Sequence, residues 1–187
     1  MELMNRDEAF LLLQKYVKHE NMIVHSLASE VVMRELAKYL NEDVEKWGLA
    51  GLLHDIDVEI TNADLVIHGL EAVKILSQKK VSLEVIEAIK LHNEKASGEI
   101  RSTVFQHALA AGETITGLII ATAKVYPDKK IKSVKVKSVV KRMKEKAFAA
   151  SVDRDIILEC EKIGISLDEF ASLALLAMSS IDDKLGL

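Results

Sequence analysis

The segment from Ala108 to Ala123, ALAAGETITGLIIATA, contains a single charged residue, Glu113. A helix that is apolar on every side must be buried, so the rest of the chain has to surround this segment. The segment is too short to span a membrane and has a carboxylate in its middle, so we expect it in a protein core. Once buried, Glu113 needs a positive partner, which either a buried Lys or Arg or a metal ion can provide.

The segments around it are predicted to be helices. One Pro, eight Gly and 4% aromatic residues leave few turn formers and few strand formers. Apolar residues recur at helical spacing behind capping residues, and no strand pattern is present. We expect one all-α domain over residues 1–187, with a core in 1–124 and an extension in 125–187 that holds a basic segment and C-terminal helices. The expected helices span about residues 7–18, 21–40, 44–53, 68–78, 83–92, 102–124, 134–146, 153–163 and 166–184.

The single cysteine, Cys160, excludes an internal disulfide and a thiolate zinc site. Its neighbours Glu159 and Glu161 would raise the pKa of its thiol, which argues against a nucleophilic role. The first residues, MELMNRDEAF, lack the basic start and apolar core of a signal peptide. We therefore expect a soluble, cytoplasmic protein with no membrane partner.

Several histidines and carboxylates lie on apolar helix faces or at helix ends. His54 and Asp55 follow the apolar run 49–53, where an unpaired buried carboxylate is costly. The C-terminal end of a helix is itself negative and disfavours Asp55 further, so a divalent cation is the simplest compensation. Three more histidines lie near apolar faces, although each alone is more often a packed core residue than a ligand. The candidate ligands are His25, His54, Asp55, His68, His92 and Glu113.

Imidazole and carboxylate ligands without thiolates suit one or two divalent ions, and they do not distinguish Mn, Fe, Co, Ni, Zn and Mg. Competing motifs are absent from the sequence: it contains no HExxH, GxSxG, GxxxxGK[ST] or GxGxxG. The Glu-x-x-His pairs of a ferritin-like di-iron bundle are missing too.

The order of these residues resembles the HD superfamily of metal-dependent phosphohydrolases. His25, the dyad His54-Asp55 in LLHDID, and Glu113 in AGETITGLI resemble the family pattern of His, His-Asp and a distal acid. His68 in IHGLEAVKIL and His92 in IKLHNEK resemble the extra histidines of its binuclear branches, such as the HD-GYP phosphodiesterases. The resemblance covers about residues 20–125, and it implies an HD-domain helical bundle with a C-terminal helical extension.

The segment around HDID is also similar to the HDIG-type subgroup, and the tail from about Pro127 resembles the extension of small stand-alone HDIG proteins. Two departures from the pattern matter. Glu113 stands where the family usually has Asp, and HDID lacks the Lys that HD-GYP enzymes place just after the dyad. The GYP motif is missing as well, so hydrolysis of cyclic di-GMP is not implied.

The resemblance implies one metal between His25, His54, Asp55 and Glu113, and a second held by His68, His92 and a bridging Asp55. Such metals activate a water molecule and stabilise the oxygens of a phosphoester. Asp57 and Glu59, just beyond the dyad, are candidate catalytic residues that would orient water or protonate the leaving group.

Between Lys124 and Lys146, ten Lys or Arg residues face only two acids, although the chain has a net charge of −4. This segment is either a solvated helix face or a contact for an anionic ligand. The candidate contacts for a substrate phosphate are Lys124, Lys137, Lys141 and Arg142.

The sequence thus predicts a phosphomonoesterase or phosphodiesterase that acts on a nucleotide or another small phosphate ester. One alternative is a non-catalytic signalling or ligand-binding module with the HD fold, which the two departures favour. The other is a nucleic-acid-binding protein that uses Lys129 to Arg142. Against it, aromatic residues flank this segment but do not interleave with its basic residues, so we expect a small phosphorylated partner and no nucleic acid.

Overall fold

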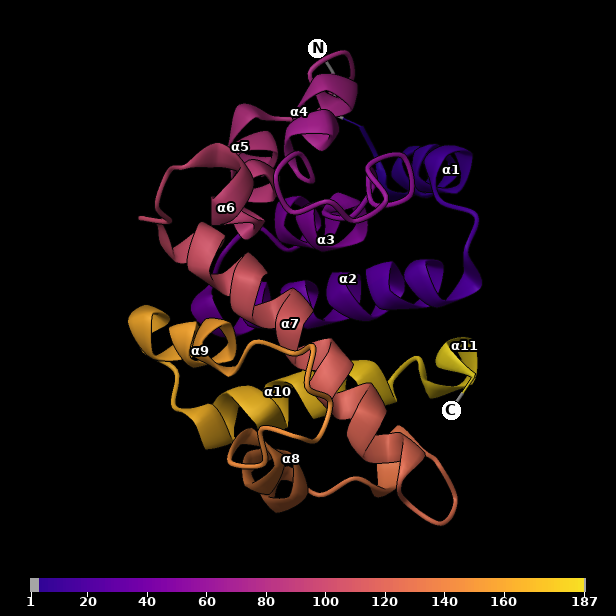
Figure 1. Cartoon of the computed structure of the whole chain (residues 1–187), viewed down its shortest axis with the longest axis vertical. Helices are drawn as coiled ribbons and strands as arrows, with labels where there is room; N and C mark the ends of the chain where they lie inside the picture. Colours follow the sequence, from indigo (N-terminus) through magenta and orange to yellow (C-terminus); the bar gives the residue numbers. More distant parts are fainter. Residues whose placement is uncertain (1–3, 187) are drawn as a thin grey trace.

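The computed structural model describes residues 4–186, and every regular element within them is a helix, which confirms the predicted all-α class (Figure 1). The two 3-10 helices are labelled η1 and η2. The elements are α1 (Arg6–Tyr16), α2 (Glu20–Leu40), α3 (Val44–Leu53), α4 (Leu70–Leu76), α5 (Leu83–His92), α6 (Glu94–Ser97), α7 (Val104–Lys124), η1 (Ile131–Ser133), α8 (Val136–Met143), α9 (Arg154–Ile157), η2 (Leu158–Ile163), α10 (Leu167–Ser179) and α11 (Asp182–Leu185).

Helix ends agree with the sequence where a capping residue marks them clearly. Asp43 and Ser82 cap α3 and α5 at the predicted positions, each accepting a hydrogen bond from a backbone amide. Asn5 caps α1 in place of Asp7, because its side chain and Glu8 form a capping box. Helix α4 begins after Gly69, whose φ of +94° breaks the helix expected to start near His68.

The C-terminal half contains more breaks than the sequence predicts. The expected helix 153–163 divides into α9 and η2, and the expected helix 166–184 divides into α10 and α11. Helix α8 is shorter than the predicted 134–146, and the polar loop expected after His92 contains the short helix α6. Hydrophobic periodicity therefore does not predict the helix boundaries that tertiary packing fixes.

Helix α7 crosses the molecule. In Figure 1, α1 to α6 lie in the upper part of the view and α8 to α11 in the lower part, and α7 runs from one to the other. It packs on α2, α3, α5, α8, α9, η2 and α10. The complete helix is longer than the apolar segment 108–123, and by length and composition alone it could cross a membrane. Core helices have the same composition, and the packing of α7 accounts for it here.

Helices α2 and α3 approach each other at Gly51. A Cβ atom at this position would lie 2.5 Å from the carbonyl oxygen of Ser29, so only glycine fits. His25 lies one turn before Ser29 on α2, and His54 follows Gly51 by three residues at the end of α3. The close approach of the two backbones thus brings these two histidines together.

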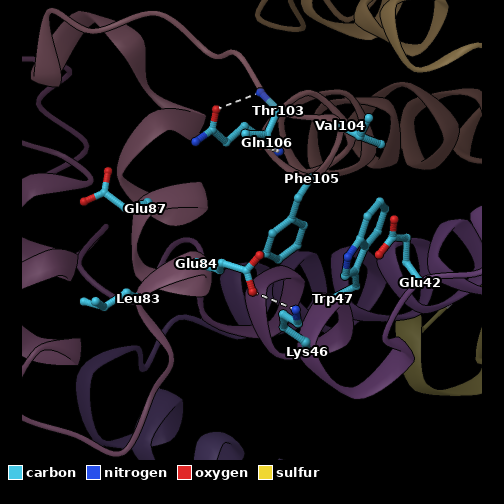
Figure 2. A pocket seen from close by; sticks show the side chains of 10 residues that line it. All are labelled: Glu42, Lys46, Trp47, Leu83, Glu84, Glu87, Thr103, Val104, Phe105 and Gln106. Carbon is cyan, nitrogen blue, oxygen red and sulfur yellow. Dashed lines mark hydrogen bonds and ion pairs between the residues drawn. The ribbon is translucent and has the colours of Figure 1, made fainter.

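The N-terminal end of α7 is held by a separate contact, shown in Figure 2. The rings of Trp47 and Phe105 stack with their centroids 5.0 Å apart, joining α3 to α7. Lys46 Nζ lies 2.7 Å from Glu84 Oε2 and joins α3 to α5. A hollow of about 410 Å³ lies over this stack, and none of the candidate ligands lines it.

We predict that Gly51→Ala destabilises the protein by about 1–3 kcal/mol, the usual cost of overpacking, because the new methyl group meets backbone that cannot move aside. Unfolding in urea measures the change. Gly48→Ala is the comparison on the same helix, because the atoms nearest to the added methyl group belong to the side chain of Arg34 and not to backbone. We expect a smaller loss, from displacement of Arg34 against Glu30 and Glu45. Equal stability of the two variants would contradict the close contact.

Candidate metal centre

Asp55 lies among four histidines that come from four parts of the chain. Asp55 Oδ1 lies 3.4 Å from His54 Nε2 and 3.1 Å from His68 Nε2. It also lies 3.5 Å from His92 Nε2, and Asp55 Oδ2 lies 3.5 Å from His25 Nε2. The histidines belong to α2, the end of α3, the turns before α4, and the last residue of α5. The fold therefore gathers four of the six predicted ligands around a fifth, Asp55.

The sixth predicted ligand, Glu113, borders the same cluster from α7. Its Oε2 lies 3.7 Å from His25 Nε2, and no Lys or Arg within residues 4–186 forms an ion pair with it. The Nε2 atoms of His25 and His54 are 3.1 Å apart, and those of His68 and His92 are 3.0 Å apart. Two groups thus share Asp55, one with His25 and His54 and one with His68 and His92.

Backbone carbonyl groups fix the tautomers of two rings. His54 Nδ1 lies 2.8 Å from the carbonyl oxygen of Gly51, and His92 Nδ1 lies 2.5 Å from that of Ile89. A carbonyl oxygen can only accept a hydrogen bond, so both Nδ1 atoms carry a hydrogen. In its neutral form each ring then directs the lone pair of Nε2 toward Asp55 and the other ligands.

Two side chains fix the same tautomer, with the hydrogen on Nδ1, in the other two rings. His68 Nδ1 lies 2.8 Å from Asp57 Oδ1, which accepts its hydrogen. His25 Nδ1 lies 3.0 Å from Thr116 Oγ1. The hydroxyl of Thr116 already donates to the carbonyl oxygen of Glu113, at 2.6 Å, so it must accept from His25. All four imidazoles therefore direct Nε2 into one space, where facing lone pairs require a cation between them.

These residues fit a metal centre. Histidines that bind metals almost always donate their other ring N–H to a carboxylate or a backbone carbonyl, which orients the ring. Imidazole nitrogen and carboxylate oxygen suit divalent ions of the first transition row. One ion would be held by His25, His54, Asp55 and Glu113, and a second by Asp55, His68 and His92.

Protons take the place of the cation when no metal is bound. Burial opposes a charge on His54, but Asp55 and Glu113 outweigh it and raise the pKa of this ring to about 9. Burial also opposes a charge on His68, whose pKa Asp55 and Asp57 raise to about 10. Burial would raise the pKa of Asp55, yet the surrounding histidines hold it well below its ordinary value. Burial and the neighbouring His54 lower the pKa of His25, so the carboxylates favour positive charge on His54 and His68 in particular.

Asp57 has a different place from the catalytic one that the sequence suggests. Its Oδ2 accepts hydrogen bonds from the amides of Gly69, at 2.7 Å, and Ala72, at 2.9 Å, while Oδ1 accepts from His68. Burial would raise its pKa, but His68 and these amides lower it. A fully buried, ionised carboxylate with both oxygens engaged orients His68 and cannot protonate a leaving group.

Glu59 also lies away from the place expected of a catalytic residue. Its Oε1 accepts hydrogen bonds from the amides of Lys18, at 2.8 Å, and His19, at 2.6 Å, in the connection between α1 and α2. The turns that follow Asp55 direct this side chain away from the ligands. Proximity in sequence to the dyad does not bring Glu59 into the site.

A cleft of about 690 Å³ opens over the ligands, and His25, Asp55, His68, His92 and Glu113 all line it. Its far wall comes from α9 and η2, and its basic residues are Lys95, Arg101 and Lys162.

The four basic residues expected to contact a phosphate do not line this cleft. Lys124 follows Glu113 by about three helical turns, or about 16 Å along α7. Arg142 pairs with Glu145 and lies over the ring of Phe148, with its Cζ atom 4.2 Å from the ring centroid. Helix α8, which bears Lys137 and Lys141, packs on α10 and α7 in the lower part of Figure 1.

Some residues that support the candidate ligands are not predicted from the sequence. Thr116 follows Glu113 by three residues on α7, so helical spacing alone could have placed it on the same face. Arg101, His107 and Glu159 form a buried cluster behind His92, and nothing in their local sequence marks it.

Comparison with known protein families identifies the family of this chain. A family model described as the HD domain matches residues 22–147, more than half of the sequence. The chain therefore belongs to the HD domain family, which confirms the resemblance, and the match runs past the core boundary predicted at residue 124. HD domains typically bind divalent metals and act as hydrolases, and the His and Asp clusters described above agree with metal binding. The searches of curated proteins and of solved structures returned no match.

We predict that Thr116→Val weakens metal binding by about 10- to 100-fold, the usual effect of losing the group that orients a ligand. The valine leaves Nδ1 of His25 without an acceptor. Titration with Mn²⁺ measures the affinity. Thr122→Val is the control on the same helix, because that hydroxyl bonds only the carbonyl of Leu118. Equal affinity of the two variants would show that Thr116 does not orient His25.

We also predict that the melting temperature of chelator-treated protein falls as the pH rises from about 6.5 to 10. His54 and His68 have folded pKa values of about 9 and about 10, above the ordinary value of 6.5. The stability gained from their protonation is complete below 6.5 and is lost as the pH passes the folded values. Metal-loaded protein should lose less, because the metal replaces the protons. A flat profile without metal would contradict these pKa values.

Proposed function

We propose that this protein is a metal-dependent phosphohydrolase, a phosphomonoesterase or phosphodiesterase of a nucleotide or another small phosphate ester. The observation that supports it best is the convergence of four oriented imidazoles and two carboxylates at an open cleft, which three of the imidazoles and both carboxylates line. Membership of the HD domain family favours phosphate ester hydrolysis over other metal chemistry.

The residues of the chain prepare this site for the reaction. A bound divalent metal would lower the pKa of a coordinated water and offset the charge of the phosphate. Asp57 and Thr116 hold the rings of His68 and His25, so the ligands need little rearrangement on metal binding. Asp55 Oδ1 faces His54, His68 and His92, and Oδ2 faces His25, so this one carboxylate can serve both groups of histidines.

The charge of the cleft makes phosphate binding depend on the metal. Carboxylates outnumber Lys and Arg in its lining, so without metal the cleft repels an anion. Two of its cations are engaged with Glu159: Arg101 at 2.8 Å and Lys162 at 3.6 Å. Lys95 forms no ion pair in the described part of the chain, which makes it the cation most available to a phosphate oxygen.

The volume of the cleft allows an organic group beside the phosphate. About 690 Å³ is within the usual range of small-molecule sites and exceeds what inorganic phosphate alone would fill. Val152 and Ile156 on one side and Leu65 in the turns before α4 add apolar lining. A nucleotide or a sugar phosphate therefore suits the cleft.

A second candidate function is a ligand-binding module with the HD fold and no turnover. The observation that favours it is the engagement of Asp57 and Glu59, which leaves neither candidate acid free to protonate a leaving group. Glu113 in place of the usual Asp also changes the ligand set of the family. Such a module would bind metal and phosphate esters without releasing phosphate.

The test is metal analysis of protein purified without chelator, followed by assays with Mn, Fe, Co, Ni, Zn and Mg on nucleotides and phosphodiesters. We expect bound or acquired metal and the release of phosphate or a phosphomonoester. Asp55→Ala should abolish both, because it removes the carboxylate that all four histidines surround. Asp168→Ala, an exposed position on α10, is the control and should alter neither.

The other outcomes separate the candidates. Protein that takes up none of these metals would overturn the proposal. Metal binding with thermal shifts on nucleotides but no product would favour the binding module. A stoichiometry of one that His68→Ala and His92→Ala leave unchanged would limit the centre to the group around His25 and His54.

A further inference from the structure

The segment that follows the family match contributes residues to the cleft over the candidate metal centre. The match ends at residue 147, and Glu159 lies in η2, which packs on α7 together with α9. The side chain of Glu159 is buried, and it also lines the cleft. A carboxylate in this position has to be compensated by charge from the HD core.

Arg101 provides that charge in a two-pronged ion pair. Its Nε donates to Glu159 Oε2 at 2.9 Å and its Nη2 donates to Glu159 Oε1 at 2.8 Å. His107 on α7 adds a third contact, with Nδ1 2.7 Å from Glu159 Oε2. All three residues are less than 10% exposed, so the pair is withdrawn from solvent. Each charge has one further ion-pair partner at a longer distance: Glu94 lies 3.5 Å from Arg101 Nη2, and Lys162 lies 3.6 Å from Glu159 Oε1.

The remaining nitrogen of the same guanidinium reaches the end of α5. Arg101 Nη1 donates to the carbonyl oxygens of Leu91, at 2.8 Å, and His92, at 3.2 Å. The last carbonyl groups of a helix have no partners within the helix, so Arg101 fixes where α5 ends. His92 is the last residue of α5, and its ring nitrogen faces Asp55.

The neighbouring Asn93 extends this support to the second histidine of the same group. Its Nδ2 donates to the carbonyl oxygens of His68 and Leu65, each at 2.9 Å. The backbone that follows His92 therefore also holds the backbone of His68. A shift of the end of α5 would move both rings away from Asp55.

We propose that Glu159, acting through Arg101, is a positioning residue for His92, so that the C-terminal segment completes the half of the metal centre formed by Asp55, His68 and His92. The inference rests on the proposed metal centre and adds a contribution from residues outside the HD match. The rings of His54 and His25 are oriented by hydrogen bonds to Gly51 and Thr116, which involve neither Arg101 nor Glu159, so we expect their half of the centre to depend much less on this ion pair.

The experiment is titration of the whole metal-free chain with Mn²⁺, in which electron paramagnetic resonance measures the free ion at each step. The wild type should bind two equivalents. Glu159→Gln removes the charge opposite Arg101, and we expect it to weaken one equivalent by about 10- to 100-fold while the affinity of the other changes by much less. Glu161→Gln, an exposed position in the same 3-10 helix, is the matched control and should bind as the wild type does.

Arg101→Lys is a second variant, in case Glu159→Gln does not fold by circular dichroism. Lysine keeps the charge but cannot bond the carboxylate and the helix end together, so it should also weaken only one equivalent. Two equivalents at wild-type affinity in either folded variant would overturn the inference and leave the proposed function intact. Loss of both equivalents would overturn it too, because the effect would then be general.

A wild type that binds one equivalent would overturn this inference alone, since the half around His92 would then hold no metal. A wild type that binds none would overturn the proposed function itself.

Discussion

The structure is organised around a buried carboxylate that needs positive charge. Asp55 lies within 3.1–3.5 Å of four imidazole nitrogens, and each of those rings is held so that its lone pair is directed inward. Repulsion among these groups has to be overcome by a cation, which makes the pocket a binding site by its electrostatics rather than by its shape. The close approach of α2 and α3 at Gly51 brings His25 and His54 to Asp55, and the long core helix α7 brings Glu113 to His25.

The ligand side chains could be predicted because each leaves a local mark. A histidine or acid on an apolar helix face is visible from periodicity alone, and the capping residues Asp43 and Ser82 fixed the ends of the helices that bear His54 and His92. The lone charge of the segment 108–123 marked Glu113 in the same way. The fold class and the side chains that form the cluster were therefore within reach of the sequence, and their role as metal ligands stays a prediction.

The residues that support these side chains could not be predicted from the sequence, because their roles arise from contacts between distant segments. Asp57 and Glu59 look equivalent beside the dyad, yet the irregular turns direct one to His68 and the other to the start of α2. The dense positive charge of 124–146 gave no information on where α8 packs. Glu159 meets Arg101 across 58 positions of sequence, a pairing that no local pattern reveals.

The shared position of Asp55 has a thermodynamic consequence for metal loading. One carboxylate serves both groups of histidines, so occupancy of one half changes the charge and the orientation that the other half offers. Linkage requires this influence to be reciprocal: whichever half fills first alters the affinity of its neighbour by the same factor. If both halves hold a metal, as proposed, loading would be cooperative or anticooperative rather than independent, and the fraction of fully loaded protein would not simply follow the affinity of either half.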